Sequence, residues 1–368
     1  RYSNPLLQLA AAEEKIIFLR GDVAFNDEIF SPVNGLGPLF VATSCGSCHA
    51  GDGKGHPFTM LTRFGQSDTL NGNQFLHNGG PQLQHRAISG FLPEQIPGGA
   101  TFSAFMPPAN TGLGFLDAVQ DASILASADP ADADGDGISG RANWIHPPVY
   151  TSLRINSISV NGKYIGRFGK KAATYDLLQQ TATAYNQDIG ITSSYEAFDT
   201  YSGQVIDPEV SNQRVLDVVF YLRTLKAPVQ RKQDDADVQA GKQLFINSSC
   251  GKCHTPQLTT GPSSIAALSN KTFSPYTDLL LHDMGTGLND GYTEGTALLQ
   301  EWRTPPLWGL GLSRNSQGGQ YFLLHDGRAK TVEEAILLHG GEATNSRDQF
   351  QQLTQQQKQQ LIKFLESL

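Results

Sequence analysis

Apolar residues recur at helical spacing in two segments far apart in the chain. The first runs from Ser211 through the largely apolar residues 220–225, and the second runs from Thr354 to Leu368. Each segment begins at a hydroxyl residue, which suits a helix N-cap, and repeats apolar residues every three to four positions. The pattern therefore predicts two amphipathic helices, each closing one half of the chain.

A third helix is predicted to end at His339. Thr331 and Glu334 form a capping-box pattern at its start, and two glycines after His339 end it. Asn161 and Gly162 form a hairpin-type turn, so a short strand pair is predicted within residues 155–165. The 38 glycines and 19 prolines indicate many ordered loops. The predicted fold class is mainly α with long ordered loops.

The sequence also contains an internal repeat, which is the signature of repeated structural units. Residues 37–40 lead into a Ser-Cys-x-x-Cys-His segment at 44–49, and residues 241–245 lead into another at 249–254. A Pro-Pro pair is followed by Gly-Leu-Gly in both halves, at 107–114 and at 305–311. The first closing helix ends at Ala227-Pro228, and residues 230–237 form a polar linker. We therefore predict two modules, 1–228 and 229–368.

All four cysteines belong to two CxxCH motifs, Cys45–Cys48–His49 and Cys250–Cys253–His254. Two thiols at this spacing can reach the vinyl groups of one porphyrin, and the following His can ligate its iron. Zinc is the alternative for two CxxC pairs, but zinc gives no reason for a His after both. No cysteine remains for a disulfide framework. The motifs predict two haem c groups in two cytochrome-c-like modules, the first enlarged by insertions.

Composition and charge exclude two classes of partner. The net charge of −8 argues against nucleic acid, since no basic stripe is present to neutralise phosphates. No apolar run reaches the length of a transmembrane helix. The sequence begins at Arg1 without an initiator Met, and we expect an export signal to have been removed. Because haem c is attached outside the bacterial cytoplasm, we expect a periplasmic or cell-surface protein.

The layout resembles the di-haem oxidoreductases related to bacterial cytochrome c peroxidases, over nearly the whole chain. The motifs that carry the resemblance are Gly-Leu-Gly-Pro-Leu-Phe at 35–40, Gly-Pro-Gln-Leu-Gln at 80–84, Asp-Gly-Asp-Gly-Ile-Ser-Gly-Arg at 134–141, Arg-Phe-Gly-Lys-Lys at 167–171, Arg-Thr-Pro-Pro-Leu-Trp-Gly-Leu at 303–310 and His-Asp-Gly-Arg at 325–328. The resemblance implies a di-haem enzyme, although a fold shared with a family does not fix the substrate.

His339 is the predicted second axial ligand of the C-terminal haem. The resemblance implies a ligand at this point, where the relatives commonly have Met. Imidazole in place of a thioether would lower the reduction potential, because the thioether favours ferrous iron more. The alternative is an exposed His that complements the helix dipole.

Five further residues are assigned to the same haem pocket. In the relatives the residue matching His325 lies close to the haem edge, so His325 is predicted to bond a propionate or to orient a neighbour. Axial ligation by His325 is the alternative. Arg303 and Arg328 are predicted propionate partners, because guanidinium pairs well with carboxylate. Trp302 and Trp308 are predicted to pack in the haem pocket, and a role as electron relays is the alternative.

The N-terminal haem is predicted to have an open iron, because its module has no His at the position that matches His339. An inserted residue could instead supply a ligand, and the candidates are Met106, His77, His85, His146 and Lys171. A peroxidase also needs a distal acid–base group. Lys171, in a Phe-Gly-x-Lys pattern shared with the family, is predicted to be that base or an iron ligand, with a propionate ion pair as the alternative. Glu94 and Glu196 are the candidate distal carboxylates.

Residues 132–138 resemble the first half of an EF-hand calcium loop. Asp132, Asp134 and Asp136 stand at loop positions that supply ligands, and the carbonyl of Ile138 is a fourth. Asn143 replaces the glutamate that usually completes the motif. The pattern predicts a structural Ca²⁺ site, and an Asp/Gly-rich surface turn without metal is the alternative.

The leading hypothesis is a peroxidase-like oxidoreductase. A small redox protein or another donor would deliver electrons to the C-terminal haem, and H2O2 or another small oxidant would be reduced at the N-terminal haem. One alternative is an oxidase that acts on a partner protein or an organic substrate. Another is a non-enzymatic di-haem electron carrier with both irons closed.

Overall fold

The computed structural model describes residue 9 and residues 11–368. Helices hold 34% of the residues and strands 11%, so the chain is mainly helical. The α-helices are α1 Ala12–Asn26, α2 Cys45–Cys48, α3 Leu113–Asp117, α4 Asp121–Leu125, α5 Leu177–Ile189, α6 Asn212–Thr224, α7 Ala236–Asn247, α8 Ser313–Ser316, α9 Val332–Leu337, α10 Thr344–Gln352 and α11 Gln355–Ser367. In this described part, no helix has the length and apolar character needed to cross a membrane.

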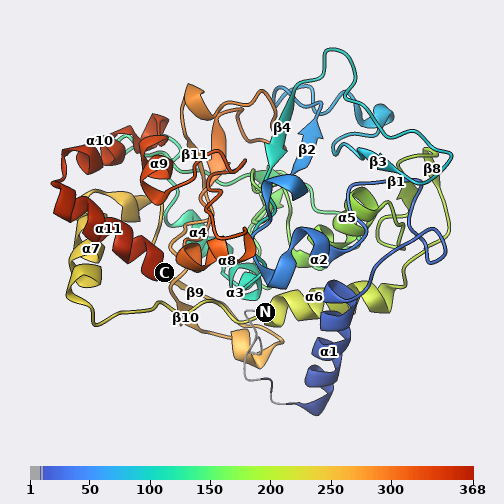
Figure 1. Cartoon of the computed structure of the whole chain (residues 1–368), viewed down its shortest axis with the longest axis horizontal. Coiled ribbons are helices and arrows are strands. Elements are labelled where there is room, and N and C mark those ends of the chain that lie inside the picture. The colour runs from blue at the N-terminus through green and yellow to red at the C-terminus, as the bar shows by residue number, and fades with distance from the viewer. Residues whose placement is uncertain (1–8, 10) are drawn as a thin grey trace.

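The strands are short and pair two by two, always antiparallel. The pairs are β1 Leu39–Phe40 with β3 Arg86–Ala87, β2 Leu61–Phe64 with β4 Phe102–Phe105, β5 Trp144–Ile145 with β6 Tyr164–Ile165, β7 Phe198–Asp199 with β8 Gln204–Val205, β9 Leu258–Thr259 with β10 Thr272–Phe273, and β11 Leu281–Asp283 with β12 Glu301–Arg303. These ribbons pin long loops in place without forming a larger sheet (Figure 1).

Two helix pairs form matching crossings, α1 with α6 and α7 with α11 (Figure 1). A glycine allows the close approach in each. A Cβ on Gly21 would lie 2.2 Å from the Asp217 carbonyl oxygen, and one on Gly241 would lie 2.0 Å from that of Gln360. Any side chain there would force the helices apart. The repeat read from the sequence is therefore also a repeat of helix packing.

An aromatic residue follows each crossing glycine by four positions and packs on the closing helix. The ring centroid of Phe25 lies 5.6 Å from that of Tyr221, and Phe245 lies 5.4 Å from Phe364. Both rings also lie near the histidine of the adjacent CxxCH motif, with ring centroids 6.0 Å apart for Phe25 and His49 and 6.4 Å apart for Phe245 and His254. The crossings thus position the two motifs through one intervening ring.

The hydrophobic cores do not divide at one point in the sequence. The larger cluster holds α1, α5 and α6 together and also includes Leu258, Leu280 and Trp308 from the C-terminal half. The smaller cluster joins α7 and α11. Residues 258–308 therefore pack largely on the N-terminal core. The division at 228/229 stays a prediction.

Local predictions can be compared with the structure at three points. The hydroxyls of Ser211 and Thr354 cap α6 and α11, as expected. Thr331 caps α9, which ends at Leu337, just before His339. Val160 and Lys163 bridge across the expected turn. However, the strand that follows, β6, pairs with β5 and not with residues 155–160, so the predicted strand pair was only partly right.

Candidate functional site

The first CxxCH motif forms the short helix α2, capped by the Ser44 hydroxyl. His49 follows it, and its Nδ1 lies 2.9 Å from the Pro108 carbonyl oxygen. Burial lowers the pKa of His49 to about 4, so its imidazole is neutral at neutral pH. A Nδ1–H that donates to a carbonyl leaves the Nε2 lone pair for a metal. The ring is therefore held in the form that an iron ligand requires.

The second motif repeats this arrangement. The Nδ1 of His254 lies 3.1 Å from the Tyr276 carbonyl oxygen. Burial lowers the pKa of His254 to about 4, and the nearby charge of His339 lowers it further. His339 therefore lies within electrostatic range of His254. Its own pKa is lowered by burial, and its Nδ1 lies 2.7 Å from the Ala335 carbonyl oxygen. This places two neutral imidazoles at one site, as a pair of axial ligands would need, although ligation by His339 stays a prediction.

Different groups face the first motif. Burial raises the thiol pKa values of Cys45 and Cys48, and the carboxylate of Asp188, at the C-terminal end of α5, raises them further, so it lies close to both thiols. Burial raises the pKa of Asp188 itself to about 6. The buried Gln82 amide donates to its carboxylate. Sequence reasoning missed Asp188, because an Asp at a helix end carries no motif, and it left Gln82 without a role.

Glu94 is connected to this region. Its Oε2 accepts a hydrogen bond of 2.6 Å from the Gln84 backbone N–H. The Gln84 amide in turn donates to the Gln187 carbonyl oxygen, beside Asp188, at 3.1 Å. Burial raises the pKa of Glu94 to about 7, which suits a group that exchanges protons near neutral pH.

Glu196, the other candidate carboxylate, has different partners. Its Oε1 accepts from the Tyr150 hydroxyl at 2.6 Å, and its backbone contacts Ser193. Among the described hydrogen bonds, none joins Glu196 to the Gln84 segment. The geometry therefore favours Glu94, and the catalytic role of either residue stays a prediction.

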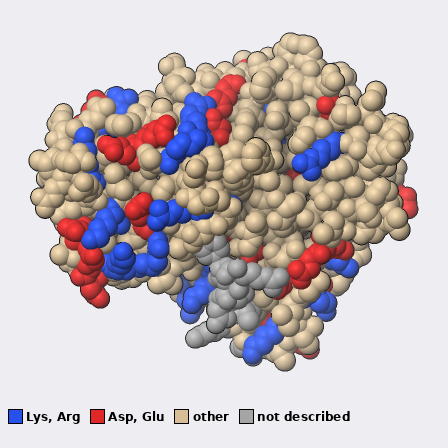
Figure 2. Space-filling view, viewed as in Figure 1, with Lys and Arg blue, Asp and Glu red and all other residues tan. Residues whose placement is uncertain are grey.

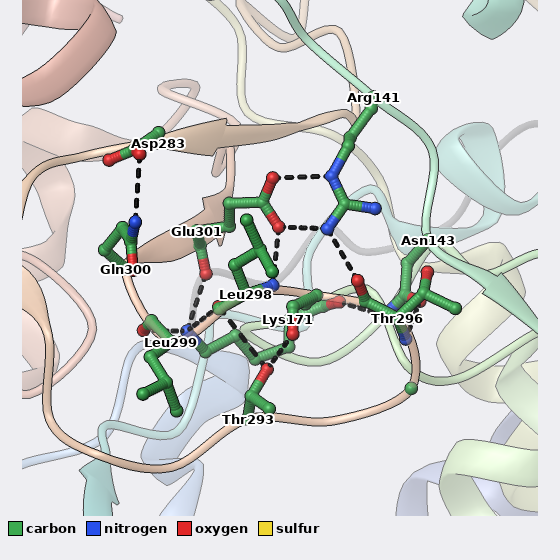
Figure 3. A network of polar contacts seen from close by, with 12 residues as sticks. Arg141, Asn143, Lys171, Asp283, Thr293, Thr296, Leu298, Leu299, Gln300 and Glu301 are labelled. Carbon is green, nitrogen blue, oxygen red and sulfur yellow. Dashed lines mark hydrogen bonds and ion pairs between the residues drawn. The ribbon is translucent and has the colours of Figure 1, made fainter. Parts of the chain in front are cut away.

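Lys171 is fully buried and is held by the loop formed by residues 293–301 (Figure 3). Its Nζ donates to the carbonyl oxygens of Leu299 and Glu301 at 2.7 and 2.6 Å. It also lies 3.6 Å from the ring centroid of Trp302. Burial lowers the pKa of Lys171 to about 7. These partners are those of a cation that fixes a loop, and the predicted role as a distal base or ligand stays a prediction.

The same loop is fixed from its other side (Figure 3). Arg141 makes a two-pronged ion pair with Glu301, and the Asn143 amide bonds both the Thr296 N–H and the Lys171 carbonyl. Together with Lys171, these contacts hold β12 in place. The consequence is a fixed position for Trp302 and Arg303, which belong to that strand.

His325 stacks on Trp302, with ring centroids 3.7 Å apart. Its Nε2 lies 2.5 Å from Asp290 Oδ2. Arg328 makes ion pairs with Asp290 at 3.0 Å and with Asp326 at 2.6 Å. His325 and Arg328 therefore have carboxylate partners within the protein, whereas Arg303 donates to the carbonyl oxygens of Gly169 and Thr304. Because Arg328 already neutralises the two aspartates, their closeness to His325 gives little support for a metal.

The remaining candidate ligands of the first iron lie in varied places. Met106 is fully buried, and its Cε packs where a Cβ on Gly327 would be, 2.4 Å away. His77, His85 and His146 are exposed. Ligation of the first iron by any of these residues stays a prediction.

A histidine that sequence reasoning missed lies beside the second motif. His282 is buried, with Nε2 2.8 Å from Asp278 and Nδ1 2.7 Å from Glu342. Its Nδ1 also lies 3.5 Å from Cys253 Sγ. Burial opposes a charge on the ring, but the hydrogen bonds to Asp278, Cys253 and Glu342 raise the pKa of His282 well above its ordinary value. β11, which carries His282, packs against the turn at 341–343 that carries Glu342.

The predicted calcium loop gathers three carboxylates, but not the expected three. Carboxylate oxygens of Asp129, Asp132 and Asp134 lie within 4.8 Å of one another. Asp136 instead forms an ion pair with Lys252 of the second motif. The Ile138 N–H donates to Asp136 at 2.8 Å. Asp129 was missed because it precedes the motif, and a calcium ion there stays a prediction.

Comparison with known proteins gives one family match. Residues 102–368, more than half of the chain, match the family described as "Di-haem oxidoreductase, putative peroxidase". No curated protein matches the chain.

Two solved structures are similar over most of the chain. One is a chain of Kuenenia stuttgartiensis hydrazine synthase, with 14% identity, a TM-score of 0.43, and coverage of 97% of this chain and 88% of that one. The other is a MauG-like protein associated with microbial copper homeostasis, with 14% identity, a TM-score of 0.44, and coverage of 100% and 90%. At these values the likenesses establish neither a shared fold nor a shared activity.

Proposed function

This chain belongs to the di-haem oxidoreductase family, and from that premise we propose that it is a peroxidase-like enzyme with two covalently bound haem c groups. Cys45, Cys48 and His49 would hold one group. Cys250, Cys253 and His254 would hold the other, with His339 as its second axial ligand. When bound, haem supplies an iron that exchanges electrons and can bind a small oxidant.

The observation that carries the proposal is the difference between the two motifs. At the second, His339 acts electrostatically on His254. At the first, a carboxylate, Asp188, acts on both cysteines. A site with two imidazoles suits electron transfer. A site lined by acidic and amide groups suits proton transfer to a small substrate.

We assign the proton-transfer role to Glu94. Its raised pKa, to about 7, lets it both accept and return a proton near neutral pH. Reduction of one H2O2 to two waters consumes two electrons and two protons. The electrons would come from a small redox protein or another donor at the C-terminal site. Protons would reach the N-terminal site through Glu94.

The location follows from the chemistry of attachment. Haem c is attached outside the bacterial cytoplasm, so the proposal includes a periplasmic or cell-surface location. Fractionation of the native source, with the haem stain of each fraction, tests this part separately from the activity.

The test of the activity is an EPR spectrum of the protein poised with one haem reduced. In the relatives the site can open only after the partner haem is reduced, so the fully oxidised form alone is insufficient. We expect a high-spin ferric signal that shifts when cyanide is added, together with donor-dependent consumption of H2O2. Low-spin signals unmoved by cyanide would reject the peroxidase and favour an electron carrier.

A further inference from the structure

Three cationic side chains come together between the two CxxCH motifs. Lys54 follows the first motif by five residues, Lys170 lies at the tip of the turn bridged by Phe168 and Thr174, and Arg303 ends β12. The pKa of Lys170 is lowered well below its ordinary value, first by burial and then by the charges of Lys54 and Arg303. Lys54 and Arg303 therefore both lie within electrostatic range of Lys170.

The cluster has no carboxylate in ion-pair contact among the described residues. The guanidinium of Arg303 donates to the carbonyl oxygens of Gly169 and Thr304, at 3.0 and 3.1 Å. The carboxylate of Asp326 acts on Lys170 only at longer range, and it already pairs with Arg328. The three side chains are half-buried, and their crowding is unfavourable unless an anion compensates the like charges. The arrangement therefore calls for an anionic ligand.

The cluster is adjacent to both motifs. The charge of Lys170 adds to the effect of burial in lowering the pKa of His49, so Lys170 lies near that ring. At the other end, burial lowers the pKa of Arg303 and the charge of Asp278 opposes that shift, so Asp278 lies near Arg303. Asp278 also forms a hydrogen bond with His282, which contacts Cys253. A ligand bound to these cations would therefore lie next to the groups attached at either motif.

Backbone contacts hold the three residues in fixed positions. The Arg303 N–H donates to the Lys170 carbonyl oxygen at 3.0 Å. The Ser316 hydroxyl, from α8, donates to the Lys54 carbonyl oxygen at 2.7 Å. Residues from both halves of the chain thus build one preorganised site, as strong anion binding requires.

We propose that Lys54, Lys170 and Arg303 form a shared clamp for haem propionates between the two haem sites. Propionates are the carboxylates that haem carries, and a guanidinium and two ammonium groups match them in charge and hydrogen bonding. These three residues take the role of propionate partner that was predicted for Arg328, because the Arg328 guanidinium is already paired with Asp290 and Asp326. They also take the propionate ion pair that was the alternative role of Lys171, because the Lys171 ammonium donates to backbone carbonyl oxygens.

The clamp also implies a redox effect. A positive charge close to haem stabilises the ferrous form, which is one unit more negative than the ferric form. The three cations would thus raise the midpoint potential of the haem whose propionates they bind. This inference rests on the proposed binding of haem but not on the proposed reduction of peroxide.

The experiment uses Lys170→Gln in the full-length protein loaded with haem. Spectroelectrochemical titration should show the ferrous-to-ferric ratio of one haem, at a fixed potential, falling about tenfold relative to wild type. The propionate bending band in the resonance Raman spectrum should shift as well. Lys170→Arg, which keeps the charge, should restore most of both signals. Lys226→Gln, at an exposed lysine, is the matched control and should change neither.

Two outcomes would overturn the clamp. One is a Lys170→Gln variant that carries two haems with wild-type potentials and an unmoved propionate band. If that variant does not load haem, Lys54→Gln provides the same readouts, and wild-type values there reject the clamp. Wild-type protein with two haems and no peroxide turnover would reject the proposed function alone, because the titration and the Raman spectrum do not depend on turnover.

Discussion

The two CxxCH regions share one supporting frame and differ in what faces it. In each, a helix crossing tightened by glycine places an aromatic ring against the motif, and a carbonyl oxygen fixes the Nδ1 of the histidine. The surroundings then diverge. His339 lies within electrostatic range of His254, whereas Asp188 and the Gln84–Glu94 pair lie on the side of the first motif.

The comparison teaches that the frame is conserved within the chain while the insertions set the chemistry. The residues that distinguish the first site, Gln84, Glu94 and Asp188, lie outside the repeated segments. Charged side chains also gather unevenly on the face shown in Figure 2. They are denser over the C-terminal helices, and a broad uncharged area covers the region of β2 to β4. The two halves therefore differ in surface as well as in site.

The largest effect is expected when the two cysteines of one motif are removed at a time, because this separates the contributions of the two sites. The double variant Cys45→Ala, Cys48→Ala should retain one covalent haem and lose peroxide turnover to the background rate, at least ~100-fold. The matched variant Cys250→Ala, Cys253→Ala should also retain one haem but keep the cyanide-sensitive signal. Pyridine haemochrome content and EPR measure both. A cyanide-sensitive signal that survives only in the first variant would reverse the assignment of the sites.

Glu94→Gln tests whether the first site differs from the second by a group that transfers protons. Without a group that transfers protons, kcat should fall by about 10²- to 10⁴-fold. In the wild type, turnover should rise with pH as Glu94 loses its proton near its pKa of about 7, and this limb should vanish in the variant. Steady-state kinetics from pH 5 to 9 measure it. Glu196→Gln is the control, and an equal loss there would remove the reason for choosing Glu94.

His339 tests whether the second site is closed. His339→Ala should convert the C-terminal haem to a high-spin, cyanide-binding form. His339→Met should keep it low-spin and raise its midpoint potential by about 0.1–0.3 V, part of the roughly 0.8 V range that axial ligands cover. EPR and potentiometry provide both readouts. His77→Ala, at an exposed histidine, is the control. Unchanged spectra in His339→Ala would show that another group closes the site.

Lys171 separates a structural role from a catalytic one. Lys171→Met leaves buried carbonyl groups of residues 298–301 without their donor, so the free energy of unfolding should fall by about 2 kcal/mol. Denaturant unfolding measures this, with Lys226→Met as the exposed control. A catalytic base would behave differently, since its loss would reduce kcat in folded protein and change the pH profile while stability stayed nearly the same.

The smallest expected effect concerns calcium. If the loop binds Ca²⁺, saturating ion should raise Tm by a few degrees, because binding to the folded state alone stabilises it. Asp132→Asn should abolish the increase, and Asp136→Asn should reduce it less, since Asp136 is engaged by Lys252. Differential scanning calorimetry measures Tm with and without calcium. An unchanged Tm would favour a surface turn without metal.

The sequence by itself determined the two motifs, the repeat and the helices around it. These features depend on short-range spacing, and spacing is what a sequence records. Ser211, Thr331 and Thr354 cap helices where the pattern predicted, because a cap bonds backbone only a few residues away. The family followed from the same local motifs.

Only the tertiary structure decided which side chains meet at each motif. Lys170 and Lys171 are neighbours in one signature, yet Lys171 bonds the loop at 298–301 and Lys170 joins Lys54 and Arg303. Asp188 and His282 carry no motif, and folding brings each to a partner from another segment, Gln82 for Asp188 and Glu342 for His282. Burial and these pairings set their charges, and both arise when segments 106 and 60 residues apart in the chain pack together.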